Sequence, residues 1–268
     1  MVTTTDREAE AGTEQFRTVK SAERALLVLE IVSAAPGPLS VAELHRRTGY
    51  PRSSLHQLLH TISAMGWLEI SPDSGTVSIG SRALIVGTSY LDRDPALPHA
   101  VLALERVRDR SGYTTHYARL DGANVLYLAT RETTQSRRAT SRVGRRLPAH
   151  ATALGKALLA DLTAEERRST LGDGELVSLM PNTIVDHRLL EEDLERTRER
   201  GFAFEREENT PGVACVSATV GYRIPATDAI SCSLPLDAAG EDEISRVSEL
   251  LLDETARLAR TLKAAGVR

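Results

Sequence analysis

The sequence predicts an α+β protein with an N-terminal winged helix-turn-helix, a linker helix and a C-terminal domain of mixed strands and helices. Three observations support this prediction. The 268 residues exceed the usual size of one hydrophobic core, so two domains are expected. Two helical patterns flank Gly49-Tyr50-Pro51, and two strand-like runs follow them. Beyond residue 95, helix and strand patterns alternate between turn signals.

The composition is that of a globular protein, with 41% hydrophobic and 26% charged residues. The aromatic content of only 4% argues against a stacking platform for single-stranded nucleic acid. The first residues are polar, and no apolar run approaches the ~20 residues of a membrane span. A cytoplasmic location without a membrane partner is therefore expected. Cys215 and Cys232 lack CxxC or histidine-ligand spacing, so we expect free thiols, no disulfide and no metal.

The chain is expected to divide into four segments. Residues 1–17 are polar and acidic without periodicity, which predicts a disordered lead. Residues 18–80 form the winged helix-turn-helix. Residues 81–94 form a linker helix, whose stiffness would transmit orientation between domains. Residues 95–268 form the C-terminal domain.

The first domain begins with a helix over residues 21–33 that completes a three-helix core. Its predicted inner face consists of Ala22, Ala25, Leu29 and Val32. Ser40 and Glu43 have the S-x-x-E spacing of a capping box, so a second helix begins there. Gly49 can adopt the left-handed conformation that ends this helix.

The helix that Pro51 begins has two faces of opposite character. The spacing of a buried stripe is found at Leu55, Leu58, Leu59 and Ile62. The opposite face has hydrogen-bonding side chains and no carboxylate, which suits the edges of DNA bases in a major groove. The residues expected to contact double-stranded DNA are Arg46, Arg52, Ser53, Ser54, His56, Gln57 and His60.

Strands over residues 67–70 and 76–79, joined by Ser71-Pro72-Asp73-Ser74-Gly75, predict a hairpin directly after this helix. A hairpin in that place is typical of a wing. The alternative is an ordinary helical hairpin with a solvated polar face, and the wing favours DNA binding. Residues 39–60 contain three arginines and one glutamate, which gives this segment a modest positive charge. Linking two or four subunits would strengthen such weak phosphate contacts.

The second domain alternates helices and strands, with Asp94 and Pro95 at its first helix and an Asp121-Gly122 hairpin turn. Thr163 and Glu166 have capping-box spacing. The predicted helices cover residues 95–112, 152–162, 163 onward, 186–200 and 241–265. The predicted strands cover residues 113–120, 125–130, 202–204, 213–220 and 229–234. Sheet plus flanking helices is typical of a sensor domain.

Other features do not indicate catalysis. Gly155-Lys156-Ala157 lacks the first glycine and the final Ser or Thr of a phosphate-binding loop. Cys215 lies in an apolar strand without an activating partner for a cysteine–histidine site with His150. No enzymatic activity and no cofactor are expected. Residues 131–146 contain six arginines and one glutamate, which indicates a solvated edge or subunit contact in preference to a second phosphate contact.

Several spaced motifs resemble the isocitrate-lyase-regulator (IclR) family of bacterial transcription factors, over nearly the whole chain from about Ser21. They are Ser21-Ala22-Glu23-Arg24-Ala25-Leu26, Gly49-Tyr50-Pro51-Arg52-Ser53-Ser54, Leu147 through Ala157, Asp193-Leu194 through Phe202, Glu207 through Cys215, and Ala229 through Ser233. The resemblance implies a winged helix-turn-helix and a GAF-like effector domain. It also implies homodimers or dimers of dimers that act on operators near catabolic genes, most often as repressors.

The resemblance also implies an effector pocket. Its residues here are Leu147, Ala153, Leu154, Glu205, Val213, Cys215, Ser231 and Ser233. Helix-start amides and two hydroxyls on one side of a strand would hold a carboxylate. Ala153 stands where some relatives have glycine, and Glu205 where some glyoxylate-responsive relatives have aspartate. A carboxylate in the pocket needs donors, so we expect a small polar acid or ureide (allantoin, allantoate or glyoxylate) ahead of aromatic acids.

The leading hypothesis is an effector-responsive repressor. One alternative is a transcriptional activator of the same family that responds to an aromatic or other catabolic acid. The sequence does not distinguish an activator from a repressor. A third alternative is a metabolite-binding protein that uses its helix-turn-helix for assembly. Loss of sequence-selective binding in a Gln57→Ala protein would distinguish the first two hypotheses from the third.

Overall fold

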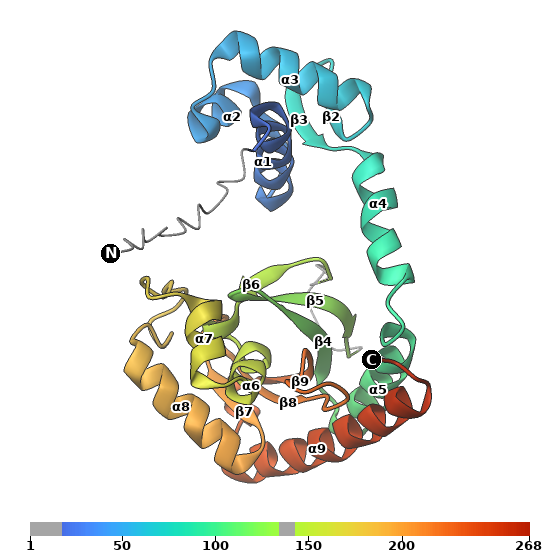
Figure 1. Cartoon of the computed structure of the whole chain (residues 1–268), viewed down its shortest axis with the longest axis vertical. Helices are drawn as coiled ribbons and strands as arrows, with labels where there is room; N and C mark the ends of the chain where they lie inside the picture. Colours follow the sequence, from blue (N-terminus) through green and yellow to red (C-terminus); the bar gives the residue numbers. More distant parts are fainter. Residues whose placement is uncertain (1–17, 134–142) are drawn as a thin grey trace, which may run out of the picture. The chain divides into compact units, whose positions relative to one another are not determined.

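The computed structural model describes residues 18–133 and 143–268, which divide into two units (Figure 1). The first unit ends at Asp92 and the second spans Arg93–Arg268. Within the described residues, no helix is long and apolar enough to cross a bilayer. The architecture is α+β, as predicted: a winged helix-turn-helix and an α/β domain.

The first unit packs three helices against a small antiparallel sheet, of strand order β1-β3-β2. Its core is formed by Val28 and Val32 of the first helix, Leu44 of the second, and Leu55 and Leu59 of the third. The elements are α1 (Lys20–Ala34), β1 (Leu39–Ser40), α2 (Val41–Thr48), α3 (Arg52–Ala64), β2 (Leu68–Ile70), β3 (Thr76–Ile79) and α4 (Ser81–Asp92). The predicted wing is the β2–β3 hairpin.

Two details of this unit differ from the prediction. Ala22 is exposed and Val28 is fully buried, because α1 packs on β3 and α2 through its later turns. Only half of the capping box at α2 forms. The Ser40 hydroxyl accepts a hydrogen bond from the Glu43 amide at 3.1 Å, but the Glu43 carboxylate pairs with Arg46 and Arg47.

The second unit is built on a six-stranded antiparallel sheet, of order β6-β5-β4-β9-β8-β7. Helices α5 and α9 pack on one face, and α6 packs on the other with α8 against it (Figure 1). The helices are α5 (Leu97–Ser111), η1 (Ala149–Ala151), α6 (Ala153–Asp161), α7 (Ala164–Leu171), α8 (His187–Arg200), η2 (Leu236–Ala238) and α9 (Glu241–Ala264). The strands are β4 (Thr114–Asp121), β5 (Asn124–Arg131), β6 (Arg146–Pro148), β7 (Ala203–Arg206), β8 (Val213–Thr219) and β9 (Asp228–Pro235).

Most helix ends in this unit follow their local signals. The capping box of Thr163 and Glu166 is complete, and Asp186 caps α8. Helix α5, however, begins two residues after the predicted Pro95. The Asp94 carboxylate accepts hydrogen bonds from the amides of Ala96 and Leu97, so the chain turns once before the helix starts.

Asp94 is also held by an ion pair at the start of the unit. Arg119 on β4 binds Asp94 through Nη1 at 2.6 Å and Asp228 on β9 through Nε at 2.6 Å. Both carboxylates are buried. Buried carboxylates are stabilised when paired, so this trio, the Arg119 anchor, fixes the entry of the chain to the sheet.

Candidate nucleic-acid interface and effector pocket

The turn between α2 and α3 is held by local contacts. Gly49 adopts φ +67°, a left-handed conformation that other residues adopt only with strain. His45 Nδ1 donates to the Tyr50 carbonyl at 2.7 Å. The Arg24 guanidinium lies 4.9 Å from the centre of the Tyr50 ring. These contacts set the angle at which α3 leaves the turn.

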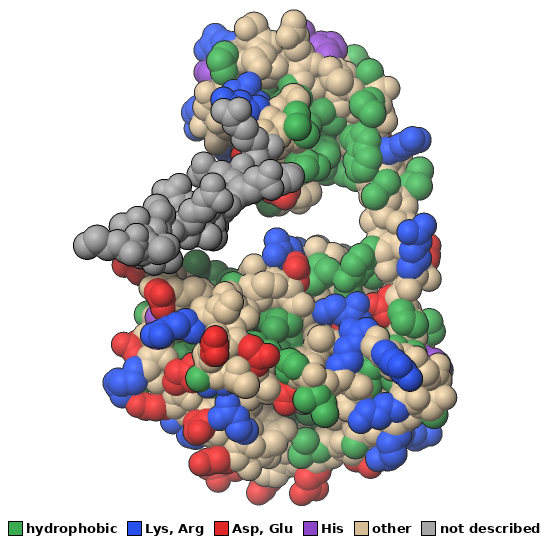
Figure 2. Space-filling view, in the orientation of Figure 1, with side chains coloured by type: hydrophobic (Ala, Val, Ile, Leu, Met, Phe, Trp, Pro, Cys, Tyr) green, Lys and Arg blue, Asp and Glu red, His purple; other side chains and the backbone are tan. Residues whose placement is uncertain are grey.

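Helix α3 turns its polar side chains to solvent. Its apolar stripe of Leu55, Leu59 and Ile62 is buried in the core. The rings of His56 and His60 lie 4.4 Å apart, and Figure 2 shows histidines on the outer surface of this unit. Of the expected DNA contacts, Ser54 is half-buried and the exposed ones are Arg46, Arg52, Ser53, His56, Gln57 and His60.

The positive charge of this surface is small and is shared between α2 and α3. Glu43 pairs with both Arg46 and Arg47 on α2, which reduces their net contribution. The wing has no lysine or arginine and carries Glu69 and Asp73. Its contacts to a phosphate backbone would therefore use hydroxyls and amides. Arg52, the first residue of α3, is exposed and forms no ion pair with the residues that the structure describes.

The arginine-rich stretch is only partly described. Arg131 pairs with Glu105 at 2.9 Å, and Arg146 pairs with Asp121 at 2.8 Å. These contacts neutralise the two ends of the stretch. Three of the six arginines, Arg137, Arg138 and Arg142, lie outside the described residues.

A small enclosed pocket lies at the first turn of α6, between this helix and the sheet. Its lining comes from four strands, α6 and the loop of residues 207–212. The lining residues are Tyr127, Thr152, Ala153, Leu154, Glu205, Asn209, Thr210, Cys215 and Ser231. The open volume is about 10 Å³, the space of one water molecule. A larger molecule would have to displace the loop.

The structure brings part of the expected effector set to this pocket, namely Ala153, Leu154, Glu205, Cys215 and Ser231. Leu147 instead packs against the core beneath α6. Ser233 lies behind Cys215, with Oγ and Sγ 3.4 Å apart, and Val213 begins β8. Cys232 faces the other side of the sheet, 3.9 Å from the Ser111 hydroxyl of α5, as strand alternation predicts.

The pocket is rich in neutral hydrogen-bonding groups. Thr152 caps α6 by accepting from the Gly155 amide at 3.0 Å, and this leaves the amides of Ala153 and Leu154 without partners inside the helix. Asn209 Nδ2 is buried and has no hydrogen-bond partner among the described residues. A helix start with free amides attracts anions, so the pocket suits a carboxylate.

Glu205, which lines the pocket, lies beside a buried charge cluster. Lys156 on α6 is fully buried, with Nζ at 2.5 Å from Glu208 and 2.9 Å from Asp193. Glu205 Oε2 accepts from the Glu208 amide at 2.9 Å. Burial raises the pKa of Glu205 above its ordinary value, and the Cys215 thiol and Lys156 act in the opposite direction. Burial likewise raises the pKa of Glu208, opposed by Lys156.

The loop of residues 207–212, which closes the pocket, is held by hydrogen bonds near its two ends. Glu207 adopts φ +51°, a sparsely populated conformation for a residue with a side chain. Its carboxylate accepts from the Gly212 amide at 2.7 Å. The Thr183 hydroxyl donates to the Glu208 carbonyl at 2.7 Å. Asn209 and Thr210, at the tip, were not predicted because only the folded loop places them at α6.

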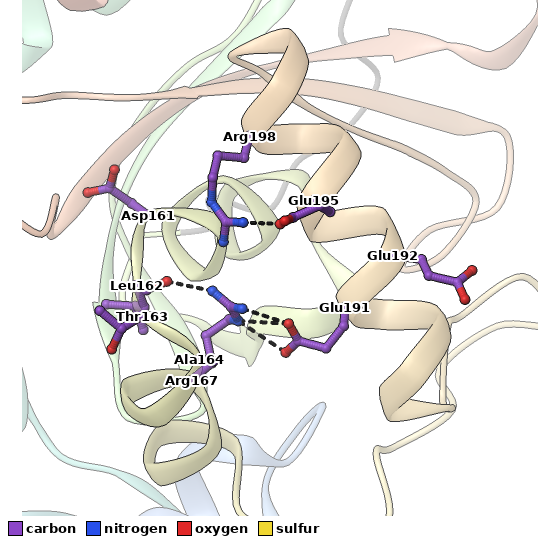
Figure 3. A pocket seen from close by; sticks show the side chains of 9 residues that line it. All are labelled: Asp161, Leu162, Thr163, Ala164, Arg167, Glu191, Glu192, Glu195 and Arg198. Carbon is purple, nitrogen blue, oxygen red and sulfur yellow. Dashed lines mark hydrogen bonds and ion pairs between the residues drawn. The ribbon is translucent and has the colours of Figure 1, made fainter.

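A larger, open groove of about 700 Å³ lies between α7 and α8 (Figure 3). Its arginines are already paired: Arg167 binds Glu191 at 2.6 Å, and Arg198 binds Glu195. The groove therefore offers no free cation to an acid. No three histidine, cysteine, aspartate or glutamate side chains converge on a metal position in residues 18–133 and 143–268.

Comparisons with known proteins match both units. The model described as bacterial transcriptional regulator IclR C-terminal matches residues 88–260, and the IclR helix-turn-helix domain matches residues 21–72. The HTH-type transcriptional regulator XynR of Escherichia coli (strain K12) is 31% identical over 245 residues, covering 91% of this chain and 97% of that protein. The transcriptional repressor IclR of the same strain is 30% identical over 254 residues, covering 93% and 92%. A crystal structure of the Thermotoga maritima IclR has a TM-score of 0.69 at 27% identity, covering 91% and 98%.

Proposed function

The chain belongs to the IclR family of transcriptional regulators, and on this premise we propose that it represses a catabolic operon in response to a small acid. Helix α3 reads the operator, and the pocket at α6 holds the effector. The effector can change operator affinity only by the difference between its binding free energies for the two conformations of the protein.

The observation that carries this proposal is the outward face of α3. Arg52, His56 and Gln57 are exposed on a helix without a carboxylate, and the opposite stripe is anchored in the core. A rigid helix with this pattern fits a major groove, where glutamine reads adenine and arginine reads guanine or phosphate.

We expect Gln57→Ala and Arg52→Ala to weaken operator binding in different ways. Loss of a base contact at Gln57 should reduce the preference for the operator over random duplex by about 1–3 kcal/mol. Loss of a phosphate contact at Arg52 should weaken binding to all duplexes and lower the salt slope by about 1. Fluorescence anisotropy over a salt series, with an operator selected from random duplexes, measures both. Glu30→Ala, exposed on α1, is the control. Unchanged selectivity in Gln57→Ala would favour the assembly alternative.

The active form in this proposal is a homodimer, or a pair of such dimers. None of the twelve residues of α4 is buried, although the helix includes Leu84 (69% exposed) and Ile85 (63%). Leu26 on α1 is 62% exposed as well. Figure 2 shows hydrophobic side chains gathered on the first unit near α4. A second copy would cover them and set two α3 helices about 34 Å apart, one turn of DNA.

We expect Leu84→Glu to separate the subunits without unfolding them. A symmetric interface contains the substitution twice, and each buried leucine contributes about 1.5–3 kcal/mol. Operator affinity should fall by at least ~10-fold because two linked contacts become single ones. Sedimentation velocity and circular dichroism test this pair of expectations. If Leu84→Glu remains a dimer at the concentrations at which the wild type does, the subunit interface lies elsewhere.

The proposed effector is a small carboxylic acid, with glyoxylate and allantoate, or the ureide allantoin, ahead of aromatic acids. Support comes from the neutral donors around the pocket and from its open volume of about 10 Å³. The six-membered ring of an aromatic acid would require a larger displacement of Asn209 and Thr210 than the two-carbon glyoxylate does. Whether the bound acid releases or strengthens repression depends on which conformation it prefers.

A further inference from the structure

The inference concerns the protonation of Glu205, and it rests on the proposed effector pocket. Glu205 is 3% exposed and lies on β7. The charged and titratable groups that face it are Lys156 from α6, Glu208 from the loop and Cys215 from β8. Tyr127 from β5 lines the same pocket. From α8, Asp193 reaches this group through Lys156, and Asp193 also pairs with Arg196.

With Glu205, the cluster contains three carboxyl groups but only two cations. The Lys156 ammonium binds Glu208 at 2.5 Å and Asp193 at 2.9 Å, and Lys156 is fully buried. Arg196 also pairs with Asp193, at 3.3 Å, so two positive charges already match these two carboxylates. A third ionised carboxylate at Glu205 would add a negative charge with little water to solvate it, and an unpaired buried charge is very costly.

The pocket itself supplies no cation to Glu205. No lysine or arginine occurs among the described residues that line it. One oxygen of Glu205 accepts from the Glu208 amide, and the Cys215 thiol adds a weak hydrogen bond. These neutral donors stabilise an ionised carboxylate less than an ion pair would.

We propose that Glu205 carries a proton when the pocket is empty and donates it, as a hydrogen bond, to the carboxylate of an acidic effector. The proton stays shared between the two carboxyl groups, so one negative charge enters a pocket that already has neutral donors at Asn209, Ser231 and the start of α6. The pocket therefore selects a small monoanionic acid over its uncharged amide. Protonated Glu205 donates a hydrogen bond to the effector, whereas an ionised Glu205 would need the effector to donate one.

The ligand-free protein provides the first test. In ¹³C-carboxyl NMR spectra recorded from about pH 5 to pH 9, the Glu205 carboxyl should keep its proton above the pH at which an ordinary glutamate ionises. Its signal should be absent from Glu205→Gln and present in Glu199→Gln, a control on the exposed side of α8. A Glu205 carboxyl that ionises at its ordinary pH overturns the proposal, whatever the effector is.

Stability gives a second readout in the same samples. A carboxyl with a raised pKa in the folded protein stabilises it below the unfolded pKa, near 4.5, and loses that contribution as the pH rises through the folded pKa. The wild type should therefore lose stability relative to Glu205→Gln as the pH rises above about 5. A pH-independent difference between the two contradicts the assignment.

Titration calorimetry tests how the protein binds its effector, by comparing glyoxylate with its uncharged amide, glyoxylamide, which should bind more weakly. Above the pKa of Glu205, glyoxylate binding should take up about one proton and weaken ~10-fold per pH unit, as linkage requires. Measurements in two buffers of different ionisation enthalpy count this proton. Glu205→Gln should bind glyoxylate without proton uptake. Glyoxylate binding to the wild type without proton uptake at high pH overturns the proposal. Absence of any heat rejects the effector assigned above, and the NMR titration then decides the protonation of Glu205.

Discussion

Gly155→Ala should destabilise the second unit by about 3 kcal/mol or more. A Cβ at this position would lie 2.1 Å from the Ala149 carbonyl oxygen and 2.3 Å from its Cα. These are backbone atoms of η1, so no flexible side chain can move aside. Helix α6 would have to shift away from η1, and the pocket at its first turn would be lost with it. Urea denaturation followed by circular dichroism measures the effect.

Gly174→Ala is the control in the same unit. Its added Cβ meets no atom within 4 Å, so it strains no contact. We expect a change of less than ~0.5 kcal/mol. If the two variants have similar stability, the close approach of α6 and η1 does not limit this fold.

Lys156→Met should cost about 3–5 kcal/mol, the usual penalty for removing one partner of a buried ion pair. Glu208 then lacks a cation, whereas Asp193 keeps its ion pair with Arg196. Burial raises the pKa of Glu208 even with Lys156 present. Raised carboxyl pKa values in the folded state favour the protonated forms. Linkage therefore predicts that the loss of stability is smallest near about pH 5 and grows toward about pH 8.

Two further proteins separate this charge effect from a simple packing effect. Lys20→Met changes the same residue type at an exposed position and should be nearly neutral. In Lys156→Met/Glu208→Gln, removal of one uncompensated charge should recover part of the lost stability. A double variant as unstable as the single one, at every pH, would show that the lysine stem contributes mainly by packing.

Elements specified by local chemistry were predictable from the sequence. The spacing of Leu55, Leu59 and Ile62 gave α3, Gly49 gave the end of α2, and the pair of Thr163 and Glu166 gave the start of α7. Strands β1 and β6 were missed. Each has only two or three residues, which is too short for alternation to be visible, and each forms by pairing with a distant strand.

The pocket was only partly predictable for a related reason. Ala153 and Ser231 followed from a family motif, whereas Tyr127, Asn209 and Thr210 come together only after the sheet and loop have folded. The burial of Lys156 also had no local signal, since its partners are 37 and 52 residues away. A lone lysine within an otherwise small and apolar helix was the one available clue.

Under the proposed function, the Arg119 anchor would connect the effector pocket mechanically to the end of the first unit. Strand β9 carries Ser231 in the pocket and Asp228 at the anchor, and three residues of strand span about 10 Å. Arg119 joins Asp228 to Asp94, which follows the last residue of α4 by two positions. A bound acid that moved β9 would therefore also move Asp94, where the chain enters the second unit.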